Sequence, residues 1–521
     1  MNKFKLGTVW NKIRANLFAS ASNPSSSADW TPVNDNRSDK VGGSFSKVTA
    51  RIDQLIDDFP YVNNIQSVIT SYVVGDGIRF SSRVVDDNGE VTATQKRQRR
   101  QIEDAIKWAN DEIDIAWQPG ISSGAKQGWE MERLSCDRRT ATGESCFIIH
   151  HDDTPGRYIP FALQPVSTLN LTEWNAVPEG SNKVYRGIEY DPKTAKIKAY
   201  HFDESAFDTT NQSASVFSTV RVPAEYVIYD NLSKHPGQFR GISPLAASVL
   251  IAHDFEDVFN SEIDAAKMTA KMIGTVKTPD AKEWIKKNAI ALNSGGSKYQ
   301  QEVQNSLMQF IGTNESIDYH TQTRPSGILL PFTQLILRMM AANANFPFEV
   351  IAADFTGMNY TVTRSSRAHH QKMIRPKTKH QITHVNQPIN RGIIQSAVLS
   401  GRLHLPGYWS NPRHYERCIY QLPGLEPVDP FRQAKADAEN LSNLIESPQE
   451  ICARRGVDFE DVMEQYKAAV GIIEDNGFDS ELFVNMIADK SSTSTQSNGN
   501  ASSRSKVDEL NEEIDGVLDY E

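Results

Sequence analysis

The chain has 521 residues, of which 39% are apolar and 23% are charged, and these proportions are typical of a globular protein with several domains. A chain of this length can bury a large apolar core without disulfides or structural metals. Its formal net charge of −10 argues against a simple nucleic-acid-binding protein.

Residues 1–47 are expected to form a flexible arm. Residues 1–20 are basic and amphipathic but lack the continuous apolar stretch of a signal peptide, and residues 20–45 are rich in Ser, Asn, Asp and Gly. Nowhere does the sequence contain an apolar run long enough to cross a bilayer. We therefore expect a soluble protein with no membrane contact and no export signal.

Apolar residues recur at helical spacing from about Val48, with an interruption at Pro60. The helical pattern ends at VVGDGIRF, where Gly75 and Gly77 predict a turn that leads into a strand. Two further amphipathic helices are predicted, at 97–117 and 127–141.

A β-rich part follows the predicted helices. At least six short runs of β-branched and aromatic residues lie between Cys146 and Asp230, separated by turn residues. The segment DPKTAK (191–196) has the composition of a hairpin turn between two of these runs. Helices and a β-rich part in one chain predict an α+β fold. The runs are CFIIH, FALQPV, VYRGIEYD, KIKAYHFD, STVRVP and YVIYD.

The longest predicted helix begins at Ser243 and Pro244, with the Ser as N-cap and the Pro in the first turn. Neither Gly nor a further Pro occurs before Gly274, so we expect one helix over residues 243–272, about 30 residues or roughly 45 Å long. Its acidic residues precede its lysines, and this order suits the helix dipole.

Residues 273–330 are mixed in character, and we expect there a strand at GTVKT, a short helix at AKEWIKKNAIAL and a strand at MQFIG. An apolar helix is predicted over residues 332–344, and Phe346-Pro347-Phe348 ends it. The loop AADFTGMNYTVT comes next. A basic helical stretch then begins near Arg364, with Pro376 and Pro388 as kinks.

Charge is segregated in the last third of the chain. Residues 361–420 contain ten Lys or Arg and one acidic residue, whereas residues 421–521 contain eight basic and twenty-two acidic residues. The acidic part is predicted to be mostly helical over 430–489 and disordered over 490–521. Such segregation indicates distinct surfaces. Direct contact with DNA and pairing of the two blocks, within or between subunits, explain it equally well.

The sequence contains no recognisable catalytic or cofactor motif. The patterns Gly-x-x-x-x-Gly-Lys-Ser/Thr and Gly-x-Gly-x-x-Gly do not occur. The stretch Gly120–Gly124 matches Gly-x-Ser-x-Gly, with Ser122 as the nucleophile. A helix and Pro119 precede it, however, in place of the buried strand that a nucleophile elbow requires. We therefore predict no catalytic residue, no enzymatic activity and no cofactor.

No metal site is predicted either. His380 and His384 are four residues apart on a predicted helix, but the segment HQITH lacks the Glu of a zincin and no third ligand is evident. They are interpreted as surface or interface histidines. The cysteines form no Cys-x-x-Cys pair and are expected to be reduced and buried. They are Cys136, Cys146, Cys418 and Cys452.

A series of segments over about residues 48–475 resembles a known protein family. The order of the segments carries this resemblance, and no single motif does. The segments are RIDQLIDDFPYVNNIQSVITSYVVGDGIRF, TATGESCFII, VPAEYVIYD followed by HPGQFRGISPLAASVLIAHDFEDVFNSEIDAAKMTA, FEVIAADFTGMNYTVTRSS, EPVDPFRQAKAD and RRGVDFEDVMEQ. In this order they resemble the lambda-type family of bacteriophage portal proteins. The chain departs from the family pattern at Thr361–Arg364, where a Ser-rich continuation is usual, and residues 280–323 match poorly.

The resemblance implies an α+β portal fold with wing, stem, clip and crown regions, assembled as a ring, typically a dodecamer, around a central DNA channel. The implied regions are an arm (1–47), the wing (48–242), the first stem helix (243–272), the clip (273–330), the second stem helix (331–349), the tunnel loop (350–363), a basic helical return to the wing (364–429), the crown (430–489) and a disordered tail (490–521). Twelve copies carry a formal charge of about −120, which suits a conduit that repels DNA.

The resemblance also implies which residues line the channel. The tunnel-loop residues are Asp354, Thr356, Gly357, Asn359, Tyr360, Thr361 and Arg364, and the candidates for the stem lumen are Asp257, Glu262, Lys267 and Lys271. If the two lysines face the lumen, they offer weak phosphate contacts that are independent of sequence. Salt bridges between subunits are an equal alternative.

As a portal, the protein would pass double-stranded DNA transiently and without sequence specificity during packaging and ejection. The terminase large subunit would dock at the clip, a head-completion or adaptor protein would later replace it, and the wing would contact the major capsid protein and scaffold. The expected location is the portal vertex of the virion, after assembly in the host cytoplasm. Two other interpretations remain open: a monomeric hydrolase with an unrecognised active site, and a nucleic-acid-binding protein that uses the basic block.

Overall fold

The computed structural model describes residues 37–86, 89–117, 126–204, 207, 218–278, 300–303, 306–312, 329–356, 359–424 and 429–476. Side chains are described from residue 44 on, except those of 268–278, 300–312 and Tyr360. The chain divides into two compact units, Met1–Pro423 and Gly424–Glu521.

The first helices of the chain are α2 (Arg37–Asp58) and α3 (Pro60–Val73), and Pro60 separates them as predicted. The helical part nevertheless begins earlier than expected, because residues 37–47 were assigned to the flexible arm and belong to α2. In this part of α2, Phe45 is 8% exposed and its ring centroid lies 4.1 Å from the guanidinium of Arg240, a contact with a residue far along the chain.

The predicted turn after α3 is confirmed, with positive φ angles at Gly75 and Gly77. The strand that follows, β1 (Arg79–Ser82), pairs antiparallel with β12 (Cys418–Gln421) from far along the chain. The two further predicted helices are α4 (Ala93–Asp111) and α5 (Gly128–Thr142).

The β-rich part forms two sheets. The first has the order β3-β2-β8 and the second β4-β5-β6-β7. The run VYRGIEYD, expected as one strand, contains two strands, because Arg186 and Gly187 adopt positive φ angles and form a tight hairpin turn. The turn predicted at 191–196 is confirmed by the backbone hydrogen bond from Asp191 to Lys196. The strands are β2 (Glu144–His150), β3 (Ala162–Pro165), β4 (Lys183–Tyr185), β5 (Ile188–Tyr190), β6 (Ile197–Asp203), β7 (Thr219–Pro223) and β8 (Val227–Asn231).

The long predicted helix is shorter than expected. A 3-10 turn, η6 (Pro244–Ala247), precedes α6 (Val249–Lys271), which has 23 residues. Ser243 caps the turn as predicted, since its side chain accepts a hydrogen bond from the backbone of Leu245. The Ser248 N–H bonds to the carbonyl of Leu245 at 2.9 Å, as in a 3-10 turn, and the Pro244 carbonyl accepts a hydrogen bond from the amide of Asn343 at 3.0 Å.

Beyond α6 the chain enters a three-stranded sheet with the order β10-β11-β9. Its strands are β9 (Met272–Thr278), β10 (Gln300–Val303) and β11 (Ser306–Gly312), and β11 runs parallel to β9. The strands predicted at GTVKT and MQFIG lie within β9 and β11. The short helix expected at AKEWIKKNAIAL lies outside the described residues.

The chain then forms α8 (Leu329–Ala344) and, after the predicted stop at Phe346-Pro347, α9 (Phe348–Ala352). The basic stretch forms α10 (Tyr360–Gln381), a π-helical turn η7 (Ile382–Asn386) and α11 (Gln387–Leu399). Pro376 lies inside α10 and Pro388 in the first turn of α11. The wide turn before Pro388 accommodates a residue that cannot donate a helical hydrogen bond.

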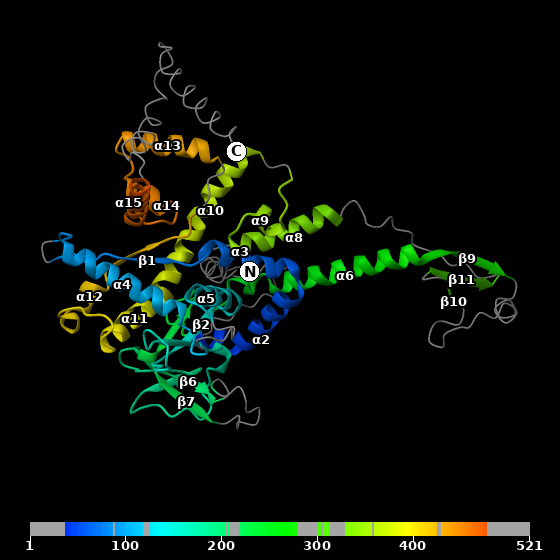
Figure 1. The fold of residues 1–521 in the computed structure, drawn as a ribbon. Helices are drawn as coiled ribbons and strands as arrows, with labels where there is room; N and C mark the ends of the chain where they lie inside the picture. The colour runs from blue at the N-terminus through cyan, green and yellow to red at the C-terminus, as the bar shows by residue number, and fades with distance from the viewer. Residues whose placement is uncertain are drawn as a thin grey trace, which may run out of the picture. The chain divides into compact units, whose positions relative to one another are not determined.

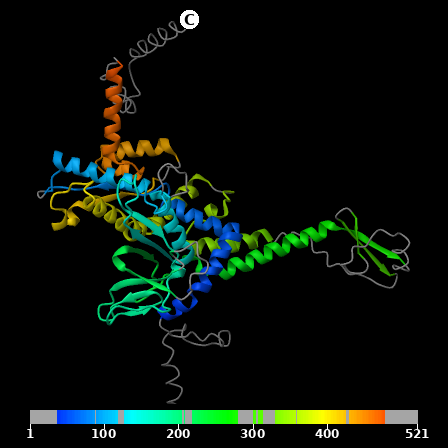
Figure 2. The ribbon, with the colours of Figure 1, turned by 60° about the horizontal axis from the view of Figure 1, so that its bottom comes forward.

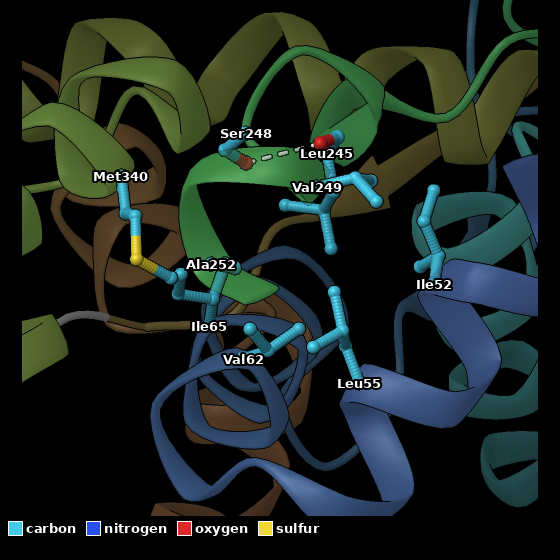
Figure 3. Close-up of a pocket in the computed structure, with 9 residues that line it drawn as sticks. All are labelled: Ile52, Leu55, Val62, Ile65, Leu245, Ser248, Val249, Ala252 and Met340. Carbon is cyan, nitrogen blue, oxygen red and sulfur yellow. Dashed lines mark hydrogen bonds between the residues drawn. The ribbon is translucent and has the colours of Figure 1, made fainter. Parts of the chain in front are cut away.

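Three buried clusters form the core of the first unit. One of them joins α2, α3, α8 and the base of α6. Figure 3 shows apolar side chains from these four helices around a cavity of about 10 Å³, which leaves space for no more than about one water. From this core α6 extends to the sheet of β9–β11 (Figures 1 and 2). Short elements complete the unit: η3 (Thr168–Asn170), η5 (Ala224–Tyr226), η8 (Tyr408–Ser410) and α12 (Pro412–Tyr415).

Within residues 429–476, the described part of the second unit is helical, as the sequence predicts. The rest of the helical part predicted to residue 489 and the tail predicted at 490–521 lie outside the described residues. Its helices are α13 (Pro430–Ser442), α14 (Pro448–Arg454) and α15 (Phe459–Asp475). Asp437, although on an acidic segment, is buried and pairs with Arg454 at 2.9 Å and Arg455 at 3.4 Å. These ion pairs tie α13 to α14.

Candidate channel-lining site

The expected tunnel loop has an ordered first part. Helix α9 ends at Ala353, which adopts a left-handed backbone conformation with φ 52°. The carboxylate of Asp354 then accepts hydrogen bonds from the hydroxyl of Thr356 at 2.5 Å and from its backbone N–H at 3.1 Å. These bonds hold the pKa of Asp354 below its ordinary value, so the loop carries a negative charge at neutral pH.

The second part of the expected loop is helical, and the prediction there was wrong. Asn359 caps α10, because its side chain accepts a hydrogen bond from the backbone of Val362 at 2.9 Å. Tyr360 and Thr361 therefore lie in the first turn of a helix and not in a loop, and Arg364 lies on this helix as the sequence predicts. The side chains of Thr361 and Arg364 are exposed. Gly357 lies outside the described residues, as does the side chain of Tyr360.

The candidates for the stem lumen lie along α6. Asp257 is exposed and Glu262 half-buried. Lys267 pairs with Asp264 in the same helix at 3.1 Å, and both side chains are well exposed, at 64% and 71%. The Lys267 ammonium thus has a local partner one turn away. Lys271 is the last residue of α6, and its side chain is not among those described.

The outer part of α6 exposes apolar side chains. Phe255, near the base, is 2% exposed, whereas Phe259 and Ile263 are 45% and 37% exposed. Helix α8 shows the same feature along its length. Its exposed apolar residues are Leu330, Phe332, Leu335 and Met339. Apolar surface of this extent on adjacent elements is typical of an interface.

A buried ion pair anchors the base of α6. The guanidinium of Arg240 lies 2.8 Å from the carboxylate of Glu144, and the two side chains are 5% and 0% exposed. Glu144 also accepts hydrogen bonds from the Tyr229 hydroxyl at 2.6 Å and the Gly241 backbone at 2.5 Å. Arg240 in turn donates to the carbonyl of Thr168 at 2.9 Å. The pair is thus fully hydrogen-bonded, the condition under which buried charges are tolerated.

Two glycines make this pair possible. Gly143 has φ 86°, and a Cβ atom there would lie 2.3 Å from the backbone of Ile242. A Cβ atom on Gly241 would lie 2.1 Å from the carbonyl oxygen of Gly143. The Gly-Glu and Arg-Gly dipeptides of two resembling segments therefore meet in space. No local signal in the sequence indicates this pairing, because 96 residues separate Glu144 from Arg240.

A second buried network joins α5, β8 and α10. Asp230 accepts hydrogen bonds from Arg139 at 2.7 Å and from His380 at 2.6 Å. Burial alone would raise the pKa of Asp230, but the hydrogen bond from His380 and the charge of Arg139 lower it. His380, expected at a surface or interface, is thus a partner of a buried carboxylate. His384 is exposed and stacks on His380, with ring centroids 4.3 Å apart.

Helix α10 packs against the C-terminal end of α8 and donates a hydrogen bond to it. The ammonium of Lys377 donates to the carbonyl of Ala344, the last residue of α8, at 2.9 Å and lies 4.9 Å from the ring centroid of Phe346. Burial lowers the pKa of Lys377 to about 8. His370 packs against Phe346 and Tyr72, with centroid distances of 4.4 and 4.8 Å, and burial lowers its pKa to about 4. The helices before and after the loop therefore pack into the same core, to which α9 contributes Ile351 and α10 contributes Ile374.

The described residues offer no candidate metal site. No three His, Cys, Asp or Glu side chains are grouped so that they could hold a metal ion in this part of the chain. All four cysteines are free, and Cys136 and Cys146 are buried as predicted, whereas Cys418 and Cys452 are half-buried. The stretch Gly120–Gly124 lies outside the described residues. Of the helices described, none combines the length and hydropathy needed to span a membrane.

Comparison with known proteins decides the family. A model described as "Phage portal protein, lambda family" matches residues 23–376, a range that includes α6, the loop and the Glu144–Arg240 pair. The chain belongs to the lambda family of phage portal proteins. This portal family is structural and not enzymatic, which confirms the absence of an enzymatic function expected from the sequence.

The "Probable portal protein" of Halomonas phage phiHAP-1 is 24% identical over 311 residues, which are 58% of this chain and 58% of that protein. The chain thus matches somewhat more than half the length of this portal relative. Two further matches come from solved particles. A chain from the neck of an empty gene transfer agent particle with C6 symmetry is 11% identical, with a TM-score of 0.41 over 82% of this chain and 96% of that one. A chain from the neck of the native particle with C12 symmetry is also 11% identical, with a TM-score of 0.39 over 80% and 94%.

Proposed function

We propose that this chain is the subunit of a ring at the capsid vertex, typically a dodecamer, through which double-stranded DNA passes during packaging and ejection. Membership of the portal family supports this function. The observation that carries it is the outer part of α6, where Phe259 and Ile263 remain exposed. A head-to-tail contact between identical copies covers such a surface and closes into a ring.

In this proposal α6 and α8 are the two stem helices and the sheet of β9–β11 belongs to the clip. The loop that begins at Asp354 lines the channel, and its negative charge keeps DNA from binding tightly there. The helices α13, α14 and α15 form the crown. The exposed Asp257 and the half-buried Glu262 contribute to the lumen or to contacts between subunits.

The partners follow from the same proposal. The terminase large subunit supplies the ATP hydrolysis and docks at the clip, and a head-completion or adaptor protein replaces it after packaging. The wing contacts the major capsid protein and the scaffold. The ring resides at the portal vertex of the virion after assembly in the host cytoplasm.

Light scattering of the purified protein, with negative-stain images of the same sample, tests the ring. We expect a ring-shaped particle with about twelve times the subunit mass of 58.3 kDa. The variant Phe259→Ala/Ile263→Ala should shift the mass toward the monomer. A matched control, Val177→Ala/Leu399→Ala, removes apolar side chains that are 77% and 71% exposed elsewhere and should leave the mass unchanged. Wild-type protein that stays monomeric even with scaffold and shell protein contradicts the proposal.

A further inference from the structure

Helix α10 carries four cations on one exposed face, at Arg364, Lys372, Arg375 and Lys379. We propose that this face, the basic stripe, binds the phosphates of double-stranded DNA through contacts independent of sequence. The inference rests on the proposed function, because it concerns DNA that has passed the loop before α10. It adds a binding surface that lies outside that loop.

The geometry of the helix places the four cations together. At 3.6 residues per turn their positions fall within a sector of roughly 80°, and they extend over about 22 Å of helix axis. The opposite face is fixed in the core by His370, which is 5% exposed, and Ile374, which is 7% exposed. Lys377 lies on the same side as His370 and is not part of the stripe, because its ammonium turns inward to the carbonyl of Ala344. The stripe is therefore held outward by the packing of the rest of α10.

The stripe has no neutralising partner within the described chain. None of its four cations forms an ion pair there, in contrast to Arg391, which lies 2.9 Å from Glu416. The sequence offers no acidic residue between Asp354 and Glu416. Four like charges on one face repel one another, so an anion that spans them would be bound favourably.

The shape of the stripe fits a duplex better than other anions. Phosphates follow each other every 3.4 Å along one DNA strand, so about 22 Å of helix matches roughly six phosphates. No Phe, Tyr or Trp occurs between Thr361 and Gly407. The stripe therefore lacks the aromatic platforms on which single-stranded nucleic acids stack. Contacts from the four cations to phosphate alone give weak binding, which suits DNA that must keep moving.

The position of the stripe along the chain supports the same partner. Helix α10 begins directly after Asn359, so Arg364 lies just over one turn from the loop proposed to line the channel. DNA that passes the acidic Asp354 would next meet the first cation of the stripe. The negative charge of Asp354 would repel DNA in the loop, and the cations of the stripe would then attract its phosphates.

The test measures the salt dependence of DNA binding by the full-length protein. The probe is a fluorescent duplex of mixed sequence and about 30 base pairs, which exceeds the length of the stripe. The variant Lys372→Gln/Arg375→Gln/Lys379→Gln should lower the slope of log K against log salt by up to about 3, and lower the affinity equally for duplexes of different sequence. The control Lys96→Gln/Arg97→Gln/Lys107→Gln removes the same charge from exposed positions on α4 and should change the slope by less than about 1.

Two outcomes overturn the inference. One is a slope that the stripe variant leaves unchanged or that both variants lower equally. The other is a stripe variant that loses binding to poly-glutamate but not to the duplex, because the stripe then binds an acidic protein segment such as residues 424–521 of another copy. Light scattering of the same samples shows whether the ring forms, so a failure of the stripe can be told from a failure of the proposed ring. A ring that forms with an inert stripe contradicts the stripe alone, and binding without a ring contradicts only the proposed assembly.

Discussion

The two halves of α6 have opposite surroundings. At its base, Phe255 packs against Phe59 with ring centroids 5.6 Å apart, and the adjoining Arg240 and Glu144 are buried together. Farther out, Phe259 is 45% exposed and the Lys267–Asp264 pair lies in water. Phenylalanine side chains and an ion pair are thus buried at or next to the base of α6, and the same types of group are exposed along its outer half. The base stabilises the subunit, and the outer half contributes little until another molecule covers it.

The largest effect is expected from breaking the buried ion pair. The variant Arg240→Met leaves the Glu144 carboxylate buried without its cation, which should lower the free energy of unfolding by about 3–5 kcal/mol. Urea denaturation followed by circular dichroism measures the change. The matched control is Arg391→Met. Arg391 pairs with Glu416 but is 55% exposed, so its loss should lower the free energy of unfolding by at most about 1 kcal/mol. Equal losses in the two variants would show that burial does not distinguish the pairs.

The two phenylalanines of α6 sharpen the comparison further. Phe255→Ala leaves a cavity in the core and should lower the free energy of unfolding by about 3 kcal/mol. Phe259→Ala removes an exposed ring and should change it by no more than about 0.5 kcal/mol, while it reduces the particle mass measured by light scattering. A Phe259→Ala variant that unfolds as easily as Phe255→Ala would contradict the division of α6 into two halves.

A smaller, pH-dependent effect is expected at the contact between α8 and α10. His370 has a pKa of about 4 in the folded chain because of its burial, below the ordinary value of 6.5. The unfolded chain therefore binds the proton more readily, and the wild type should lose stability relative to His370→Gln as the pH falls from 6.5 to 4. We expect a relative loss of about 1–2 kcal/mol across this window. Urea midpoints of both proteins measure it, and a difference that is constant with pH would contradict the buried, neutral state of His370.

The smallest effect belongs to the exposed pair. Lys267→Gln should change the free energy of unfolding by less than about 0.5 kcal/mol, because both charges are hydrated and only one helical turn apart. The difference from wild type should vanish in high salt. A loss above about 1 kcal/mol that persists in high salt would indicate that this part of α6 is buried in the measured species.

The interruptions of the chain could be predicted from local rules. Pro60 separates α2 from α3, Gly75 and Gly77 form the turn before β1, and Phe346-Pro347 ends α8, because the backbone preferences of Gly and Pro hold in any surroundings. The hairpin at 191–196 follows for the same reason. The exact start of α6 could not be predicted, since the turn before it contacts Asn343, which lies 99 residues from Pro244 along the chain.

The features of the candidate site also fall into those that the sequence predicts and those that depend on the tertiary structure. The sequence by itself determined the order of the elements, the segregation of charge and the resemblance to portal proteins, because these depend on composition and on short segments. Only the tertiary structure decided that His380 is a partner of the buried Asp230 and that Glu144 meets Arg240. Each of these facts depends on groups far apart in the chain, and the cost of burying an unpaired charge forces such groups together without any signal in the local sequence.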